Sequence, residues 1–267
     1  MYLFNGERAS TVSIADRSFQ YGDGCFTTML TRNGEIQYWP KHKARMDACL
    51  DALMIAKPDW LLIESWLAEM AYSDPKAGLK LHISRGEGGR GYSPTQVPSP
   101  NVTISAFHFP AHYEQWSRDG IALGVCSKRL GINPLLAGHK HNNRLEQVLL
   151  KADIEQQGFD DGVALDCNGH VVETTMANLF WCKGDTLFTP NLGVAGVAGV
   201  MRRVVIERLE NLSLNLVQGD FELDALLTAD EVFITNSILE VAPVTAIGEQ
   251  TFSIGNITRK IQENPLP

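Results

Sequence analysis

The sequence predicts a two-domain protein of the α+β or α/β class. Its 267 residues suffice for one large domain or two domains of moderate size. Strand-like and helix-like segments alternate in two blocks, and a polar, aromatic stretch without strong periodicity, Pro110 to Gly120, separates them. We therefore expect a smaller N-terminal α/β domain over 1–110, a linker over 111–120 and a larger C-terminal domain over 121–267.

The first block begins with short apolar and turn pieces. Asn33-Gly34 lies between two strand-like runs and predicts a β-hairpin. Helices are expected from His42 to Met54 and from Trp60 to Tyr72, and strands over 79–84 and 101–109. In the first helix the apolar residues recur at intervals of three and four, which predicts one buried face: Met46, Cys49, Leu50, Leu53 and Met54.

The second block repeats the alternation without any internal repeat of fixed period. Helices are expected from about Asn143 to Gln157 and from Met201 to Leu212. The expected strands and hairpins cover 121–127, 162–174, 178–190 and 231–236.

The charge balance limits the class of partner. A formal net charge of −8 and a pI near 5.4 argue against nucleic acid and anionic membranes, because binding to phosphate arrays requires a basic face. An anionic ligand must therefore be captured locally, by clustered arginines.

The sequence also predicts a cytoplasmic location. No stretch approaches the roughly 18 to 20 apolar residues of a membrane helix, and the start MYLFNGERAS lacks the basic and apolar regions of a signal peptide. The cysteines show no C-x-x-C spacing, so we expect neither disulfides nor structural zinc, but small buried apolar side chains: Cys25, Cys49, Cys126, Cys167 and Cys182.

Lys140 is the first candidate for chemistry. It follows a glycine at an expected loop-to-helix junction and lies between His139 and His141. A lysine held as a neutral amine by burial or by positive neighbours suits imine formation or base catalysis. The alternative is a solvated surface charge. The His-Lys-His triplet is a weak metal candidate, because side chains two positions apart on a helix diverge, and we expect no metal.

Three other segments are candidates for a ligand site. Glu173 ends an apolar strand, where a partly buried carboxylate requires a positive partner; exposure at a strand end is the alternative. The turn 196–201 leads into a helix and can cradle phosphate, although such turns are common. The segment Ser84 to Tyr92 contains four glycines, two arginines and a tyrosine, so it can approach and bind a carboxylate ligand, or it can be a flexible surface hairpin.

Taken together and in this order, the fragments resemble the fold-type IV family of pyridoxal-phosphate enzymes. That family contains branched-chain aminotransferases, D-amino acid aminotransferases and aminodeoxychorismate lyases. The shared pattern covers nearly the whole chain: Asp16-Arg17, Tyr21-Gly22-Asp23-Gly24, His42 with Arg45, Lys140, Glu173 with Asn178-Leu179-Phe180, Gly199 with Arg202, Asp230 to Phe233, and Asn236-Ser237.

The resemblance implies a D-amino acid aminotransferase-like fold, with the active site in the cleft between the domains and a homodimer as the assembly. The C-terminal domain would bind pyridoxal 5'-phosphate. Lys140 would form the aldimine with this cofactor and act as general base and acid, while Glu173 would pair with the pyridine nitrogen. The phosphate would be bound by Arg45 and a second group of residues: Val200, Met201, Asn236 and Ser237.

Within the family the sequence is most similar to the lyase branch. The elements Ser84 to Tyr92 and Gly22 to Thr28 are typical of that branch, and the tyrosine that branched-chain members carry five residues after the lysine is Leu145 here. The implied reaction converts 4-amino-4-deoxychorismate to 4-aminobenzoate and pyruvate in folate biosynthesis. A D-amino acid or branched-chain aminotransferase is the alternative enzyme, and a non-catalytic protein on an inactive enzyme fold is the alternative outside enzymes.

The substrate of such a lyase carries two carboxylates, which require positive or hydrogen-bonding groups. The candidates are Arg85, Arg90, Tyr92 and Asn142, and Phe109 is a candidate for lining the substrate ring. Either arginine could instead brace the glycine-rich loop or reach across a dimer interface.

Overall fold

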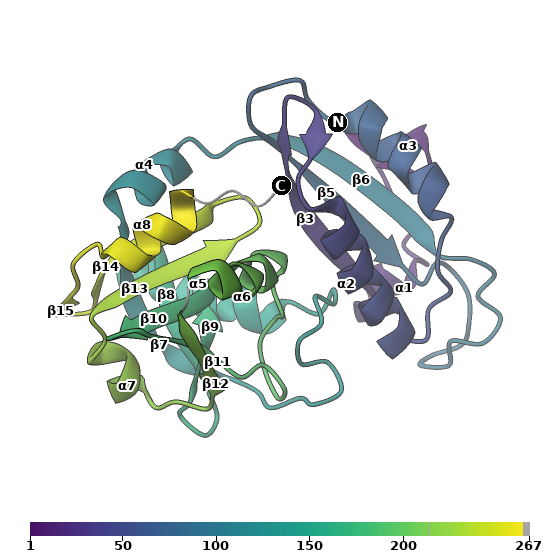
Figure 1. Cartoon of the computed structure of the whole chain (residues 1–267). Helices are drawn as coiled ribbons and strands as arrows, with labels where there is room; N and C mark the ends of the chain where they lie inside the picture. Colours follow the sequence, from purple (N-terminus) through teal and green to yellow (C-terminus); the bar gives the residue numbers. More distant parts are fainter. Residues whose placement is uncertain (213, 264–267) are drawn as a thin grey trace. The chain divides into compact units, whose positions relative to one another are not determined.

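The computed structural model describes residues 1–212 and 214–263 (Figure 1). The chain forms two compact units. The first contains Met1–Phe109 together with His139–Arg144, and the second contains Pro110–Gly138 and the chain from Leu145 onwards. The chain therefore passes from one unit to the other at three points.

The first unit is built on an antiparallel sheet of order β2-β1-β6-β5-β3-β4. The hairpin expected at Asn33-Gly34 joins β3 to β4, and both turn residues have positive φ angles, 50° and 87°. The elements are β1 (Tyr2–Phe4), β2 (Glu7–Arg8), α1 (Arg17–Tyr21), β3 (Gly24–Arg32), β4 (Glu35–Ile36), α2 (Trp39–Ala52), α3 (Trp60–Met70), β5 (Ala77–Ser84) and β6 (Asn101–His108).

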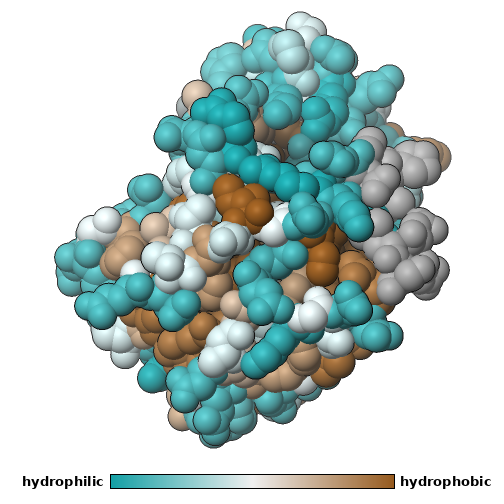
Figure 2. Space-filling view, turned by 60° about the vertical axis from the view of Figure 1, so that its left-hand side comes forward, coloured by the Kyte–Doolittle hydropathy of each residue, from teal (hydrophilic) through white to brown (hydrophobic). Residues whose placement is uncertain are grey.

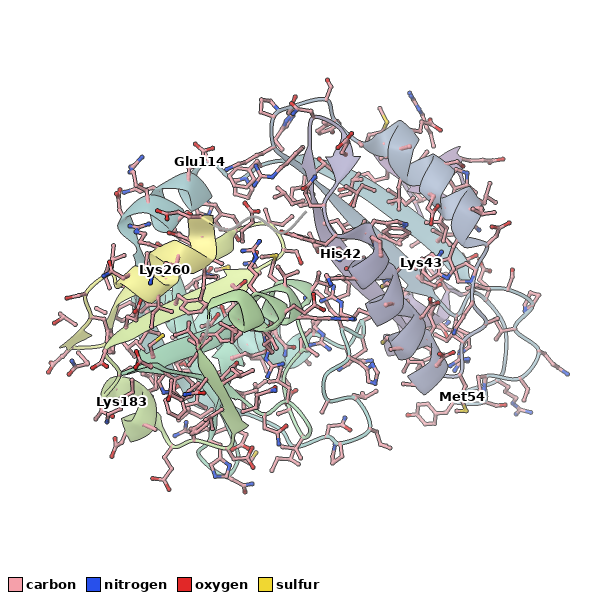
Figure 3. All side chains as sticks on the ribbon, in the orientation of Figure 1. His42, Lys43, Met54, Glu114, Lys183 and Lys260 are labelled. Atoms are coloured by element: carbon pink, nitrogen blue, oxygen red, sulfur yellow. The ribbon has the colours of Figure 1, made fainter. Side chains whose placement is uncertain are left out.

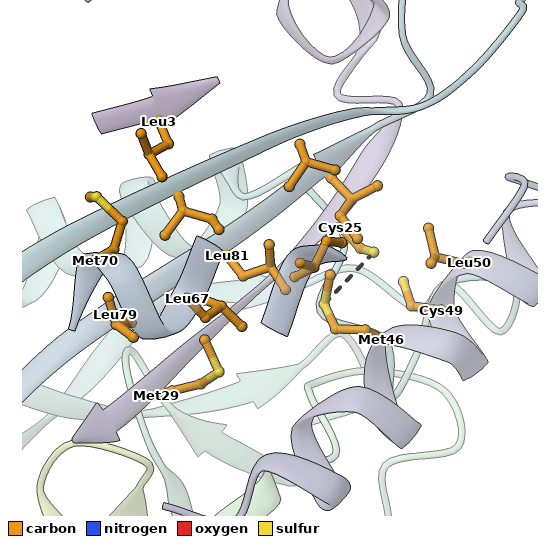
Figure 4. Packing of buried hydrophobic residues seen from close by; sticks show 14 of the residues in the cluster. Leu3, Cys25, Met29, Met46, Cys49, Leu50, Leu67, Met70, Leu79 and Leu81 are labelled. Atoms are coloured by element: carbon orange, nitrogen blue, oxygen red, sulfur yellow. Dashed lines mark hydrogen bonds between the residues drawn. The ribbon is translucent and has the colours of Figure 1, made fainter. Parts of the chain in front are cut away.

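Helices α2 and α3 bury one face of this sheet. Figure 4 shows side chains from both helices, among them Met46 and Leu67, packed against Met29 and Leu81 of the strands. One expectation for α2 is wrong. Met54 was expected on the buried face, but the helix ends before it, and its left-handed backbone leaves the side chain 80% exposed (Figure 3).

The second unit is built on a nine-stranded mixed sheet of order β12-β11-β10-β13-β14-β7-β8-β9, with β15 paired to β14. Three of its strand pairs are parallel: β11 with β12, β14 with β7, and β7 with β8. The elements are α4 (His112–Asp119), β7 (Ile121–Leu130), α5 (Leu145–Gln156), β8 (Asp161–Asp166), β9 (Val171–Thr174), β10 (Asn178–Lys183), β11 (Thr186–Pro190), α6 (Val200–Leu212), β12 (Asn215–Gly219), α7 (Leu223–Leu227), β13 (Glu231–Asn236), β14 (Glu240–Ile247), β15 (Gln250–Thr251) and α8 (Asn256–Glu263).

The stretch expected to be a linker, 111–120, contains helix α4. Tyr113 and Trp116 of this helix pack on the core of the second unit, and the Ser117 hydroxyl donates to the carbonyl oxygen of Val241. Because the apolar packing of α4 rests on Tyr113 and Trp116, its sequence shows no regular apolar stripe.

Apolar side chains reach the surface among hydrophilic ones (Figure 2). On α5, the buried residues include Leu150 and Ile154. The apolar residues that follow Lys140 at helical spacing are exposed instead: Leu145 by 70%, Val148 by 59% and Leu149 by 47%.

The five cysteines are free. Four are buried as expected, but Cys167 is exposed, because it lies in the turn that follows β8. No helix among the described residues is long and apolar enough to cross a membrane.

Candidate active site

Lys140 lies in a short segment, 139–142, that pairs with the edge of β3. The N–H of Phe26 donates to the carbonyl oxygen of Lys140 at 3.0 Å, and the N–H of Asn142 donates to that of Gly24 at 2.9 Å. Cys25 and His141 form the antiparallel bridge between them. Lys140 therefore stands opposite Phe26, and opposed residues of an antiparallel pair project from the same face.

The side-chain amines of two lysines lie over the Phe26 ring. Lys140 Nζ lies 4.7 Å from the ring centroid, and Lys80 Nζ, from β5, lies 4.5 Å from the same centroid. Both distances are typical of cation–π contacts. Burial lowers the pKa of Lys80. The first unit thus holds two amines on one aromatic surface beside the edge of β3.

A polar chain on α2 ends in a candidate anion site. Arg45 Nη2 donates to Thr27 Oγ1 at 2.5 Å, and Thr27 Oγ1 lies 2.6 Å from His42 Nδ1. Burial and the Arg45 charge hold the pKa of His42 well below its usual value, so the imidazole that faces Thr27 is neutral. His42 is labelled on α2 in Figure 3.

Arg45 itself fits a bound anion. Burial lowers its pKa to about 10, and its Nε is buried with no hydrogen-bond partner among the described residues. A buried donor without an acceptor is unfavourable, and a phosphate oxygen would satisfy it. The residue present here therefore suits the phosphate of a cofactor.

In the second unit, the carboxylate of Glu173 lies against a turn. Glu173 ends up only 6% exposed near the end of β9, and its Oε2 accepts the N–H of Val197 at 2.9 Å. The backbone N–H orients the buried carboxylate and offsets part of the cost of its burial. This arrangement fits a protonated ring nitrogen.

The turn 196–199 requires glycine at both ends. Gly196 has a φ of +83°, and a Cβ there would lie 2.7 Å from Val172 Cγ1. A Cβ on Gly199 would lie 2.1 Å from Asn178 Oδ1, which accepts the Gly199 N–H. Asn178 Nδ2 donates to the carbonyl oxygen of Val197, so one amide side chain fixes both ends of the turn.

Helix α6 begins directly after this turn. Its first residues, Val200 and Met201, present N–H groups that have no acceptor within the helix, and the helix dipole favours an anion there. Asn236 and Ser237 follow β13 in the same unit. Asn236 Oδ1 accepts the N–H groups of Ile238 and Leu239, both at 2.9 Å, so its side chain shapes the loop that presents Ser237.

Gly138, two residues before Lys140 in the sequence, is hydrogen-bonded to the turn 196–199. Gly138 forms a bridge with Val197: its N–H donates to Gly196 and its carbonyl oxygen accepts the N–H of Ala198. The turn that receives the Glu173 carboxylate is therefore hydrogen-bonded to the chain just before the Lys140 segment.

Arg85, a candidate for substrate binding, has bracing contacts instead. Its guanidinium donates to Asp23 Oδ2 at 2.7 Å and to the carbonyl oxygens of Leu53 and Met54. Together with Arg17, it lowers the pKa of Asp23, although burial opposes the shift. These bonds tie the start of the glycine-rich loop to α2.

Arg90 and Tyr92 are exposed on the same loop, and Tyr92 is 89% exposed. The Tyr92 ring forms an edge contact with the Tyr21 ring, at 5.7 Å between centroids. Both side chains are therefore accessible to a ligand. Buried Arg17 holds the loop itself by donating to four of its carbonyl oxygens, those of Gly88, Gly91, Tyr92 and Ser93.

Asn142 and Phe109 lie at different ends of the first unit's sheet. Asn142 Nδ2 donates to Ser18 Oγ at 2.9 Å, while its Oδ1 is buried and unpartnered in the described structure. Phe109 directly follows β6, where Lys76 Nζ lies 4.9 Å from its ring centroid. Asn142 is thus beside Lys140, and Phe109 is at the far end of β6.

The sequence matches a model of the class IV aminotransferase family over residues 24–247. The chain belongs to this family. The matched range includes Lys140, Glu173, the turn before α6 and Asn236.

Among class IV relatives, the aminodeoxychorismate lyase of Vibrio harveyi is 53% identical over 268 residues, which cover 99% of both chains. The crystal structure of 4-amino-4-deoxychorismate lyase from Pseudomonas aeruginosa is 38% identical, with a TM-score of 0.92 over 98% of this chain and 97% of that one. A putative branched-chain aminotransferase of Methanocaldococcus jannaschii is 30% identical over 97% of this chain and 92% of its own length. The fold expected from the sequence is confirmed.

The sequence analysis gave no role to several residues that lie among the candidate site residues in the structure. Thr27 links Arg45 to His42, Lys80 shares the Phe26 ring with Lys140, and Arg17 organises the glycine-rich loop. The alternation along β3 and β5 could have indicated Lys80, because it falls on the same face as Phe26. For Thr27, the sequence gives no signal that distinguishes it from Thr28.

Proposed function

We propose that the chain is a pyridoxal-phosphate-dependent lyase that converts 4-amino-4-deoxychorismate to 4-aminobenzoate and pyruvate. The observation that carries the proposal is the full-length similarity to the Vibrio harveyi lyase, at 53% identity. The geometry of Lys140 and Glu173 supports it, as does Leu145 at the position where the branched-chain enzymes have a tyrosine.

Residues from several segments would hold the cofactor. Lys140 would bind its aldehyde carbon, and Glu173 would hold the ring nitrogen in its protonated form. Arg45 would bind the phosphate, together with the N–H groups of Val200 and Met201 and the hydroxyl of Ser237. When bound, pyridoxal 5'-phosphate supplies an electron sink for the negative charge that develops beside the substrate amine.

Lys140 then carries the proton transfers. Its Nζ takes the proton from C4 of the substrate and returns a proton to the methylene carbon of the enolpyruvate that leaves, which gives pyruvate; this is general base and acid catalysis at one atom. Phe26 limits where the amine can lie. Loss of the enolpyruvyl group from the neighbouring carbon makes the ring aromatic, which drives the reaction toward 4-aminobenzoate.

Arg90, Tyr92 and Asn142 remain the proposed carboxylate ligands of the substrate. Phe109 is a weaker candidate for lining the substrate ring than the sequence indicates, because it lies at the end of the first unit's sheet that is opposite to Asn142. Arg85 is a weaker candidate than the sequence indicates, because Asp23 and two backbone carbonyl oxygens engage its guanidinium. We assign it the bracing role.

The proposed assembly is a homodimer. Leu145, Val148 and Leu149 form an exposed apolar stripe on α5, and such a stripe is typical of a surface that binds another protein. Since this stripe begins next to the Lys140 segment, a second copy is the partner we propose. Val148→Glu should convert the dimer to a monomer in analytical ultracentrifugation, and an unchanged mass would contradict this interface.

The proposed location is the cytoplasm, because the free cysteines suit a reducing compartment.

A substrate comparison tests the function. Purified protein with pyridoxal 5'-phosphate is given 4-amino-4-deoxychorismate, and separately D-alanine or leucine with 2-oxoglutarate. We expect 4-aminobenzoate and pyruvate in equal amounts from the first mixture. Faster formation of glutamate in the second would reject the lyase in favour of an aminotransferase.

Two variants test the roles of the residues. Lys140→Ala should lower kcat by about 1,000-fold or more, and borohydride should no longer attach the cofactor to the protein. Glu173→Gln should bind the cofactor about 10- to 100-fold more weakly in an absorbance titration, because a charge-assisted bond is lost. Glu155→Gln, on an exposed side of α5, is the matched control. Turnover near wild type in Lys140→Ala would refute its role.

A further inference from the structure

The guanidinium of Arg144 bonds to the backbone on both sides of Lys140. Its Nε donates to the carbonyl oxygen of His141 at 2.8 Å, and its Nη2 donates to that of His139 at 3.1 Å. Arg144 is partly buried and belongs to the same unit as the Lys140 segment and β3. All three carbonyl oxygens from 139 to 141 therefore accept a hydrogen bond, since Phe26 donates to the middle one.

The direction of these carbonyls explains what Arg144 does. In an extended segment, successive carbonyls point to opposite edges. The Lys140 carbonyl points to β3, so those of His139 and His141 point to the other edge, where the next strand of a sheet would lie. Two N–H groups of one guanidinium bond there in place of a neighbouring strand.

The register of this segment decides where the catalytic amine lies. Few backbone bonds join 139–142 to β3, and short pairings are prone to slip. A slip of one residue would turn the Lys140 side chain to the opposite face of the sheet, away from Phe26. Arg144 opposes the slip, because its fork fits two carbonyls of fixed spacing.

We propose that Arg144 is a positioning residue that locks the register of 139–142 and so keeps Lys140 on the Phe26 face. The inference rests on the proposed function, in which Lys140 is the catalytic residue. Lysine cannot replace Arg144, because its ammonium is a single point of charge and lacks the planar fork that spans both carbonyls.

Hydrogen exchange in the protein without cofactor tests the lock directly. Exchange is followed by mass spectrometry in peptides covering 138–146 and 22–28, for Arg144→Lys and Arg144→Met. Arg118→Lys is the control, because Arg118 is an exposed arginine whose side chain bonds to Asp119. We expect exchange about tenfold faster or more in both peptides of both Arg144 variants, with the α2 peptide unchanged.

Measuring turnover then distinguishes a role of Arg144 in positioning Lys140 from a role in stability alone. Arg144→Lys should lower kcat and kcat/KM together by about 10- to 100-fold, the effect of a catalytic group misplaced by about 1 Å. Wild-type exchange in Arg144→Lys would overturn the proposal, and so would faster exchange with wild-type kcat. If Arg144→Met does not fold, the exchange and turnover of Arg144→Lys are sufficient to test the proposal. Absence of 4-aminobenzoate with the wild-type protein would refute the proposed function. The exchange result would still test whether Arg144 fixes the register of 139–142.

Discussion

At the scale of residues, Thr27 is a buried junction between a cation and a neutral imidazole. It is fully buried, it accepts from Arg45 and it lies 2.6 Å from His42 Nδ1. A single hydroxyl is both acceptor and donor, so neither valine nor alanine can replace it. The orientation of Arg45 toward an anion therefore depends on a residue that would itself touch no cofactor.

Thr27→Val should lower the free energy of unfolding by about 1 to 3 kcal/mol, because two buried polar partners lose their bond while the volume is kept. Urea unfolding measures the loss. Thr27→Ser retains the hydroxyl and serves as the control. Equal stability of the valine variant and wild type would contradict the polar chain described here.

At the scale of elements, the turn 196–199 and helix α6 act as one piece. Asn178 of β10 bonds to both ends of the turn, and Gly199 leaves no room for a side chain beside it. The position of the first N–H groups of α6 therefore depends on a strand that is distant in sequence.

Gly199→Ala should displace Asn178, because its Cβ would lie 2.1 Å from Asn178 Oδ1. We expect a loss of about 1 to 3 kcal/mol in unfolding free energy, and weaker binding of pyridoxal 5'-phosphate. Gly193→Ala, where the nearest atom would lie at 3.4 Å, is the matched control. Calorimetry and absorbance titration check both effects. Normal cofactor affinity in Gly199→Ala would argue against a phosphate site at this turn.

Local patterns predicted the elements that depend on local causes. The apolar spacing of Met46, Cys49 and Leu50 indicated α2, and Asn33-Gly34 indicated the hairpin. Pairing between distant segments was not predictable in this way. The bridge from Cys25 to His141 places Lys140, and nothing in either segment alone specifies the partner. Helix α4 was missed because its packing rests on Tyr113 and Trp116.

At the scale of the whole molecule, the two units differ in their response to acid. The histidines with lowered pKa values all lie in the first unit: His42, His82 and His141, the last two at about 4, chiefly because of burial. Asp161, in the second unit, has a pKa raised by burial. A histidine that stays neutral when folded takes up a proton only on unfolding, so it destabilises the unit as the pH falls below about 6.5.

Acid should therefore unfold the first unit before the second. Between about pH 6.5 and pH 4 we expect the unfolding free energy of the first unit to fall, whereas protonated Asp161 favours the folded second unit as the pH falls. Hydrogen exchange of peptides from each unit, at several pH values in mild urea, measures the difference. His82→Gln should flatten the dependence of the first unit. A parallel decline in both units would contradict the assignment.

The chain crosses between the two units three times, so a single cut in the chain cannot separate one unit from the other. A fragment that ends at Phe109 would contain nearly all of the first unit but would lack 139–144, so the edge of β3 at Gly24 and Phe26 would be left open. An open edge recruits foreign strands, and this fragment alone should aggregate. The remaining chain carries the missing piece, so two separately synthesised halves have a built-in means of complementing each other.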